Sequence, residues 1–176
     1  MGKKEIRLSG TGGQGIILAG ILLGEAAVLD GREVVQTQSY GPEARGGASK
    51  AEVIISDSPI LYPKVIVPCC LLIMSQEAAV KYAESITENG VLVYDNSIIS
   101  ELPATKAKVK GIPLTRLARE EIGNIMTTNI ISLGALAAAD SLVSIESLET
   151  AIGERMGRLA ELNIRALRLG WEWGLK

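Results

Sequence analysis

The sequence predicts an α/β fold in which a mainly parallel sheet is flanked by helices and followed by a helical C-terminal part. A glycine-rich turn joins an alternating apolar run to a helix-like run. Short apolar runs then alternate with helical patterns up to Lys110, and the pattern beyond is mostly helical. With 176 residues, of which 47% are hydrophobic and 22% charged, the chain suits a single domain over residues 1–176.

The glycine-rich turn follows a strand expected at residues 5–9 and precedes a helix expected at residues 16–29, which is a Rossmann-like arrangement. Its letters, GTGGQG, satisfy the pattern G-x-G-x-x-G. Glycines permit a tight turn with positive φ and bring bare N–H groups close to an anion at the start of the helix. Such turns also serve simple close packing. The turn supplies five candidate residues for a ligand or subunit interface: Gly10, Gly12, Gly13, Gln14 and Gly15.

A dinucleotide-binding unit carries an acidic residue at the carboxyl end of its second strand, where the carboxylate holds the ribose hydroxyls. Here the second strand is expected at residues 33–37 and runs on into the letters QSY, with no acidic residue at that end. Asp30 and Glu33 stand before it or at its start. The sequence therefore argues against an NAD site.

A long polar loop occupies residues 36–49, and long loops in compact domains are usually either functional or disordered. Its glycines let Arg45 approach another surface, and a guanidinium suits a carboxylate or a phosphate. A right-handed crossover puts the ends of the first two strands at one edge of the sheet, so the loop should meet the glycine turn. The alternatives are a solvated connector and a local brace between Arg45 and Glu43. The loop adds these candidates for a ligand or subunit interface: Tyr40, Glu43, Arg45, Gly46 and Gly47.

Three apolar runs, at residues 51–56, 66–74 and 91–94, predict the next strands, and Ser75 caps a helix between the last two. Asp95 follows the last run at the carboxyl edge of the sheet, where open α/β sheets bind ligands. It is therefore a further candidate site residue, with a turn-forming role as its alternative.

Alternating lysines at residues 106–110 indicate a solvated edge strand. Helices are expected at residues 113–122 and 128–139, from the capping residue Ser144, and at residues 158–176. The last helix is either docked in the core or a partner surface, because its apolar residues form two stripes: Ile164, Leu167, Trp171 and Leu175, and Leu162, Leu169 and Trp173.

Composition excludes several classes of function. A formal net charge of -2 argues against nucleic-acid binding, and no apolar run reaches the roughly 18 residues of a membrane span, so we expect a soluble cytoplasmic protein. The chain has no histidine, which rules out imidazole ligands and histidine-based acid–base catalysis. Cys69 and Cys70 are adjacent, and because successive strand residues face opposite ways they should be small core residues rather than ligands of one metal. We expect no catalytic residue and no metal on this chain.

The glycine turn, the segment TQSYGPEARGGA from Thr37 to Ala48 and the run VLVYD from Val91 to Asp95 together resemble a known family. They are similar to the gamma subunit, or gamma domain, of 2-oxoacid:ferredoxin (or flavodoxin) oxidoreductases, over nearly the whole chain. The sequence PEARGGAS at residues 42–49 is most similar to that of the 2-oxoglutarate branch, and the pyruvate, branched-chain and indolepyruvate branches share much of this motif.

The resemblance implies a multisubunit enzyme of anaerobic metabolism that decarboxylates a 2-oxoacid, transfers the acyl group to coenzyme A and passes electrons to ferredoxin or flavodoxin. It implies alpha and beta partner subunits, with delta as a further candidate. Thiamine diphosphate, magnesium and iron–sulfur clusters are expected on these partners, with none on this chain, and coenzyme A is a co-substrate. This chain would be an accessory subunit, inactive alone, with holding coenzyme A or shaping the active-site entrance as candidate roles. The rival is a stand-alone nucleotide- or CoA-binding protein.

Overall fold

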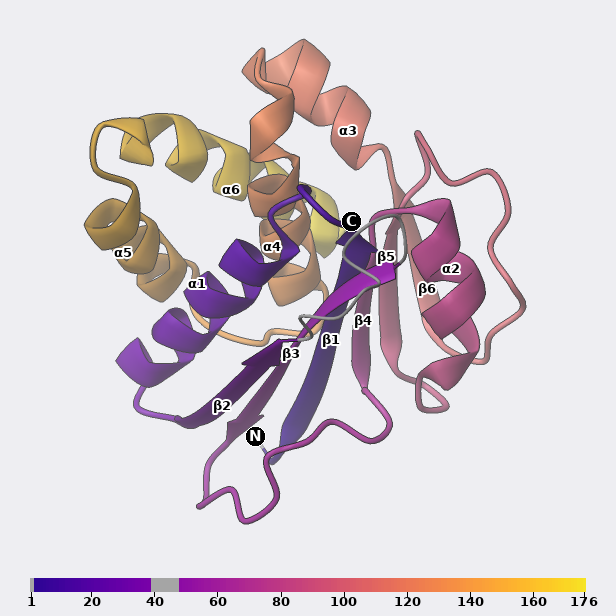
Figure 1. Cartoon of the computed structure of the whole chain (residues 1–176). Coiled ribbons are helices and arrows are strands. Elements are labelled where there is room, and N and C mark those ends of the chain that lie inside the picture. The colour runs from indigo at the N-terminus through magenta and orange to yellow at the C-terminus, as the bar shows by residue number, and fades with distance from the viewer. Residues whose placement is uncertain (1, 39–47) are drawn as a thin grey trace.

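The computed structural model describes residues 2–38 and 48–176, which form a six-stranded sheet covered by helices on both faces (Figure 1). The strands are β1 Lys4–Thr11, β2 Glu33–Gln38, β3 Ala48–Ser56, β4 Cys70–Ile73, β5 Val91–Asp95 and β6 Lys108–Ile112. The helices are α1 Ile16–Leu29, α2 Gln76–Tyr82, α3 Leu114–Leu117, α4 Thr128–Ala139, α5 Ile145–Met156 and α6 Ala160–Leu175. Short helical turns cover Ala83–Ser85, Ala118–Ile122, Ile125–Thr127 and Gly157–Leu159.

The strands lie in the order β2-β3-β1-β4-β5-β6, and β3 is antiparallel to both of its neighbours. All other described strands run in one direction, which confirms the predicted mainly parallel sheet. The crossover through α1 therefore links two strands of the same direction that are separated by β3. Both of these strands are antiparallel to β3, so they are parallel to each other, and their carboxyl ends lie at the same edge of the sheet.

The core has two parts because β4 and β5 carry apolar residues on both faces of the sheet. On one face, Leu8, Leu72 and Val93 pack against α1 and α4, and α5 and α6 form an outer layer over these helices (Figure 1). On the other face, β4 and β5 pack against α2 through a smaller cluster that includes Leu71 and Leu92. The expectation of helices on both faces is confirmed.

Helix α6 docks on α4 mainly through its small residues, and Leu167 is the one fully buried member of the two predicted apolar stripes. The buried residues of α6 are Asn163, Ala166, Leu167, Gly170 and Gly174. A Cβ built on Gly170 would lie 1.9 Å from the backbone oxygen of Ile131, so the two helix backbones are in direct contact. The helix is thus part of the core, and Trp171 and Trp173 pack half-buried at its margin.

Several predicted boundaries are confirmed by local chemistry. Ser75 Oγ accepts a hydrogen bond from Ala78 N at 3.1 Å and caps α2, and Ser144 Oγ accepts one from Ser147 N at 3.2 Å and caps α5. Strand β6 lies at the edge of the sheet, as its lysines indicated. In the part of the chain that the structure describes, no helix is both long and apolar enough to span a bilayer.

The expected strand over residues 66–74 is too long. Strand β4 begins only at Cys70, and Ile66 and Val67 are 69% and 47% exposed, because Pro68 has no N–H group for a ladder. Cys69 therefore precedes the strand, and its Sγ lies 3.9 Å from Cys70 Sγ. The expectation that the two cysteines face opposite ways is wrong for this reason.

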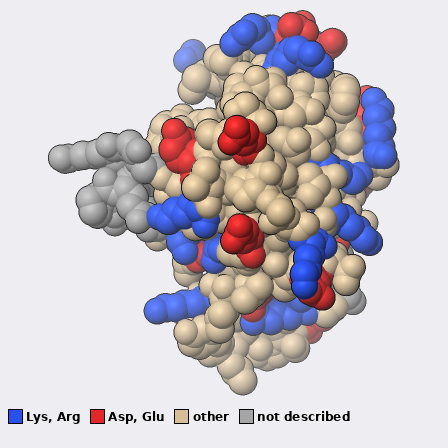
Figure 2. All heavy atoms as spheres, turned by 90° about the vertical axis from the view of Figure 1, so that its right-hand side faces the viewer, with Lys and Arg blue, Asp and Glu red and all other residues tan. Residues whose placement is uncertain are grey.

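Charges of both signs are interspersed on the molecular face that includes α2 and β6. Figure 2 shows lysine and arginine side chains scattered among acidic ones and broad uncharged areas on that face.

Candidate functional site

The carboxyl edge of the sheet brings the glycine turn, the end of β2 and the end of β5 together. Strand β1 ends at Thr11, which pairs with Ala48, the first residue of β3. Ala48, the first described residue after the segment between β2 and β3, therefore lies beside the glycine turn. Five predicted site residues belong to that segment and lie outside the described residues, so their roles remain predictions: Tyr40, Glu43, Arg45, Gly46 and Gly47.

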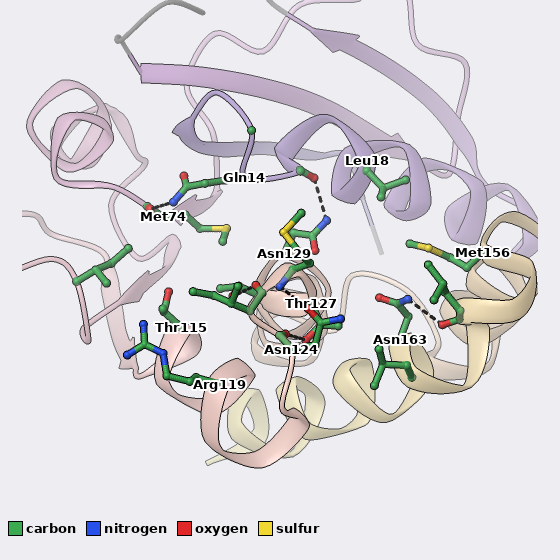
Figure 3. Close-up of a pocket in the computed structure, with 18 residues that line it drawn as sticks. Gln14, Leu18, Met74, Thr115, Arg119, Asn124, Thr127, Asn129, Met156 and Asn163 are labelled. Carbon is green, nitrogen blue, oxygen red and sulfur yellow. Dashed lines mark hydrogen bonds between the residues drawn. The ribbon is translucent and has the colours of Figure 1, made fainter.

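The glycine turn is closed by the side chain of Gln14. Its Oε1 accepts a hydrogen bond from Thr11 N at 2.7 Å, and its Nε2 donates to Met74 O at 2.7 Å (Figure 3). A Cβ on Gly10 would stand 2.3 Å from Gln14 Oε1, so the first glycine makes room for this side chain. Gln14 thus joins the end of β1 to the end of β4, while Gly12 and Gly13 form the exposed tip of the turn.

Gly15 is the N-cap residue of α1. Its backbone lies in the left-handed region, with φ 72°, and it packs against α4. Asn129 Nδ2 donates to Gly15 O at 3.2 Å, and a Cβ on Gly15 would stand 2.4 Å from that nitrogen. The described residues provide neither a side-chain cap nor a first-turn acid to α1. The positive end of its helix dipole is therefore available to an anion at the turn.

A cavity of about 610 Å³ opens beside the turn, between α1, α3, α4 and the α5–α6 corner (Figure 3). Its apolar lining consists of Leu18, Met74, Ile98, Ile125, Met126, Met156, Leu159 and Leu162. Its polar lining consists of Gln14, Thr115, Arg119, Asn124, Thr127, Thr128, Asn129 and Asn163, with Gly13 and Gly15 completing the wall. An apolar pocket with a few polar groups is the usual form of a small-molecule site.

Two features of the lining indicate what the cavity can hold. Arg119 is the charged side chain among the lining residues, and it is exposed. Asn129 is 5% exposed, and its Oδ1 is buried with no hydrogen-bond partner among the described residues. Met126 at the rim is 72% exposed. The cavity therefore combines an apolar wall, a cation and a buried amide at the start of α4.

Sequence reasoning named Gly13, Gln14 and Gly15 but missed the rest of this lining, most of which comes from the helical second half of the chain. The polar letters NIMTTN at residues 124–129 were the available signal, since two asparagines and two threonines precede an apolar helix. That signal indicates a helix start as readily as a binding site.

Asp95 lies at the predicted edge, but it is fully buried and its oxygens are occupied. Oδ1 accepts hydrogen bonds from Ser97 N at 3.0 Å and Ser97 Oγ at 2.5 Å. Oδ2 accepts from Thr115 N at 2.9 Å and from Thr115 Oγ1 at 2.5 Å. The carboxylate therefore joins the loop after β5 to the start of α3, which favours a structural role over ligand contact.

A second polar cluster, the cysteine cluster, lies at the opposite, amino edge of the sheet and consists of Lys4, Cys69, Cys70 and Asp140. Cys70 Sγ donates to Asp140 Oδ2 at 2.8 Å, and Lys4 Nζ donates to the same oxygen at 2.7 Å. The contact with Cys70 Sγ lowers the pKa of Cys69 to about 6, whereas that contact and burial raise the pKa of Cys70. Burial alone would lower the pKa of Lys4, but Asp140 outweighs it and holds the pKa above its ordinary value.

Comparison with known proteins gives consistent matches over the whole chain. The family model described as pyruvate ferredoxin/flavodoxin oxidoreductase matches residues 5–173. The 2-oxoglutarate synthase subunit KorC of Methanocaldococcus jannaschii is 52% identical over 174 residues, which are 97% of this chain and 93% of that protein. The common gamma subunit of the pyruvate/ketoisovalerate oxidoreductases of Pyrococcus abyssi is 32% identical over 177 residues, which are 96% of this chain and 95% of that protein. The crystal structure of the keto/oxoacid ferredoxin oxidoreductase gamma subunit from Geobacter sulfurreducens superposes with a TM-score of 0.89 at 42% identity, covering 98% of each chain.

Proposed function

The chain belongs to the pyruvate ferredoxin/flavodoxin oxidoreductase family, and from that membership we propose that it serves as the gamma subunit of a 2-oxoglutarate:ferredoxin oxidoreductase. The observation that carries the assignment is the 52% identity to a 2-oxoglutarate synthase subunit, extending almost from end to end of both chains. The assembled enzyme cleaves carbon dioxide from the 2-oxoacid, joins the remaining acyl group to the sulfur of coenzyme A and passes the electron pair to ferredoxin.

Within that assembly the chain works as an accessory subunit with alpha and beta partners, and delta is a further candidate. Thiamine diphosphate, magnesium and iron–sulfur clusters belong to those partners in this proposal. The cysteine count supports the placement of the clusters, because two cysteines cannot supply the four thiolates of an iron–sulfur cluster. In Pyrococcus abyssi a related gamma subunit is named as common to two oxidoreductases, which supports a subunit that does not itself choose the 2-oxoacid.

The carboxyl edge of the sheet is the surface through which this subunit contacts coenzyme A or the active-site entrance. The uncapped start of α1 at Gly15 and the cation of Arg119 suit phosphate groups. The apolar cavity between them suits an extended chain with amide groups, such as the pantetheine arm. Gly10, Gly12, Gly13, Gln14 and the segment that carries Arg45 belong to the same surface in this proposal.

Reconstitution tests the subunit assignment. The chain is coexpressed with its alpha, beta and delta partners, and ferredoxin reduction is measured with 2-oxoglutarate, pyruvate or indolepyruvate in the presence of coenzyme A. We expect activity with 2-oxoglutarate that needs all subunits, and no activity from this chain alone. A preference for pyruvate or indolepyruvate would move the protein to another branch. A monodisperse chain that binds coenzyme A but joins no complex would support the stand-alone binding protein instead.

Substitution of Arg119 tests the coenzyme A surface in the reconstituted enzyme. Arg119→Ala should raise the KM for coenzyme A by about 10-fold, the worth of one charge-assisted contact, and leave the KM for 2-oxoglutarate unchanged. Arg116→Ala is the matched control, because Arg116 is also exposed but lies outside the cavity lining. Equal effects of the two substitutions would reject the cavity as the coenzyme A surface, without affecting the subunit assignment.

A further inference from the structure

The cysteine cluster presents three metal-binding atoms at one point, away from the surface proposed for coenzyme A. The sulfurs of Cys69 and Cys70 and a carboxylate oxygen of Asp140 all lie within 4.8 Å of one another. Cys69 precedes β4, Cys70 begins it, and Asp140 follows the last residue of α4. The three groups therefore come from two segments that are 70 residues apart in the chain.

The distance between the sulfurs agrees with tetrahedral coordination. Two sulfurs that each lie about 2.3 Å from a tetrahedral Zn²⁺ are about 3.8 Å apart, and Cys69 Sγ and Cys70 Sγ are 3.9 Å apart. A sulfur and a carboxylate oxygen on the same ion are about 3.5 Å apart. The observed distance between Cys70 Sγ and Asp140 Oδ2 is 2.8 Å, which is about 0.7 Å shorter than this ligand spacing.

From this geometry we propose that Cys69, Cys70 and Asp140 bind a thiophilic divalent cation, with Zn²⁺ as its representative, and that water completes the tetrahedron. The ion takes the place of the Cys70 thiol proton, so Asp140 Oδ2 moves outward by about 0.7 Å to reach the ordinary ligand spacing. Both cysteines bind as thiolates, and the displaced protons go to solvent. No electron is transferred.

Lys4 competes with the ion for the carboxylate. Its Nζ lies 2.7 Å from Asp140 Oδ2, and the side chains of Lys4 and Asp140 are 24% and 20% exposed. Cys69 is also half-buried, whereas Cys70 is fully buried. The ion therefore enters from the side of Lys4, and the ammonium group moves into solvent as the ion binds.

The bound ion would connect the sheet to the helical part of the chain. Cys70 is fixed in β4, between β1 and β5, and Asp140 is the C-cap residue of α4. A ligand that binds the folded state alone raises its stability, so saturating Zn²⁺ should raise the thermal midpoint of unfolding.

The test is a titration of the reduced, metal-depleted full chain with Co²⁺, followed by Zn²⁺ competition. We expect one Co²⁺ per chain, thiolate-to-cobalt charge-transfer absorbance, the intense visible bands of tetrahedral Co²⁺, and displacement by Zn²⁺. Cys69→Ser should weaken binding by at least about 100-fold, and Asp140→Asn by about 10-fold. Lys4→Met should strengthen binding several-fold, because it removes the competing cation.

Glu149→Gln is the matched control, because Glu149 is a carboxylate paired with a cation, Arg168, outside the cluster. Far-ultraviolet circular dichroism verifies that each variant is folded. The proposal is overturned if the wild-type chain binds no Co²⁺ at millimolar concentration, or gives the weak spectrum of octahedral Co²⁺. It is also overturned if Cys69→Ser binds as tightly as the wild-type chain, or if Lys4→Met binds more weakly.

Discussion

Replacing Gly170 by alanine should separate α6 from α4. The added Cβ would stand 1.9 Å from Ile131 O, whereas ordinary van der Waals contact begins at 3.4 Å. The obstacle is a backbone oxygen within a helix, which no side-chain rotation can clear. Helix α6 would have to move away from α4 by about 1.5 Å at this point, although Gly134 and Gly174 hold the same contact, with built Cβ atoms 2.4 and 2.3 Å from backbone oxygens.

Overpacking of this kind costs about 1–3 kcal/mol, and more where backbone blocks the way. Alanine in a helix recovers about 1 kcal/mol relative to glycine. The upper end of that cost less the helix-propensity gain is a net loss of about 2 kcal/mol, which lowers the thermal midpoint of a chain of this size by about 4–8 °C. The free energy of unfolding is measured by urea denaturation, and the midpoint by circular dichroism.

Gly153→Ala is the matched control, because Gly153 lies within α5, is exposed and has no atom within 4 Å of its built Cβ. It should stabilise the chain by about 0.5–1 kcal/mol through helix propensity alone. The argument from close backbone contact would be refuted if Gly170→Ala were as stable as Gly153→Ala.

Two further predictions concern the hydrogen-bonded carboxylates of Asp30 and Asp95. Asp30 accepts hydrogen bonds from Ser144 and Ser147, which outweigh burial and hold the pKa of Asp30 below its usual value. Its contribution should therefore be complete above the unfolded-state pKa of about 3.9 and lost as the pH falls through the lower folded-state pKa. Asp30→Asn should cost about 1 kcal/mol at pH 7, and the cost should shrink as the pH is lowered below about 3.9, measured by urea denaturation across a pH series. Asp95→Asn replaces Oδ2, which accepts hydrogen bonds from Thr115, by an amide nitrogen that can only donate. The free energy of unfolding should fall by about 2–3 kcal/mol. A fall of less than about 0.5 kcal/mol would contradict the structural role of Asp95.

The local parts of the fold could be predicted from the sequence. Helix α1 has the expected bounds because Gly15 precedes it and the letters DG at residues 30–31 follow it, and α4 also has the expected bounds. These signals act within a few residues. The pairing of β3 between β1 and β2 was not predictable, because its apolar pattern fits either direction of a strand in that sheet.

The candidate site was predictable only where its chemistry is local. The glycine turn was recognised, but the hydrogen bond from Asn129 to Gly15 joins residues 114 positions apart. The cysteine cluster shows the same limit, since Asp140 carries no mark in the sequence that connects it with Cys70. The buried glycines of α6 were overlooked because small residues contribute little to an apolar stripe.

The pairing of Thr11 with Ala48 sets where the segment between β2 and β3 ends. Its two attachment points, Gln38 and Ala48, belong to adjacent antiparallel strands, so the sheet sets the distance between them. A substitution that shifted the register of β3 would therefore carry the second attachment point away from the glycine turn, even if it changed no residue of the segment itself.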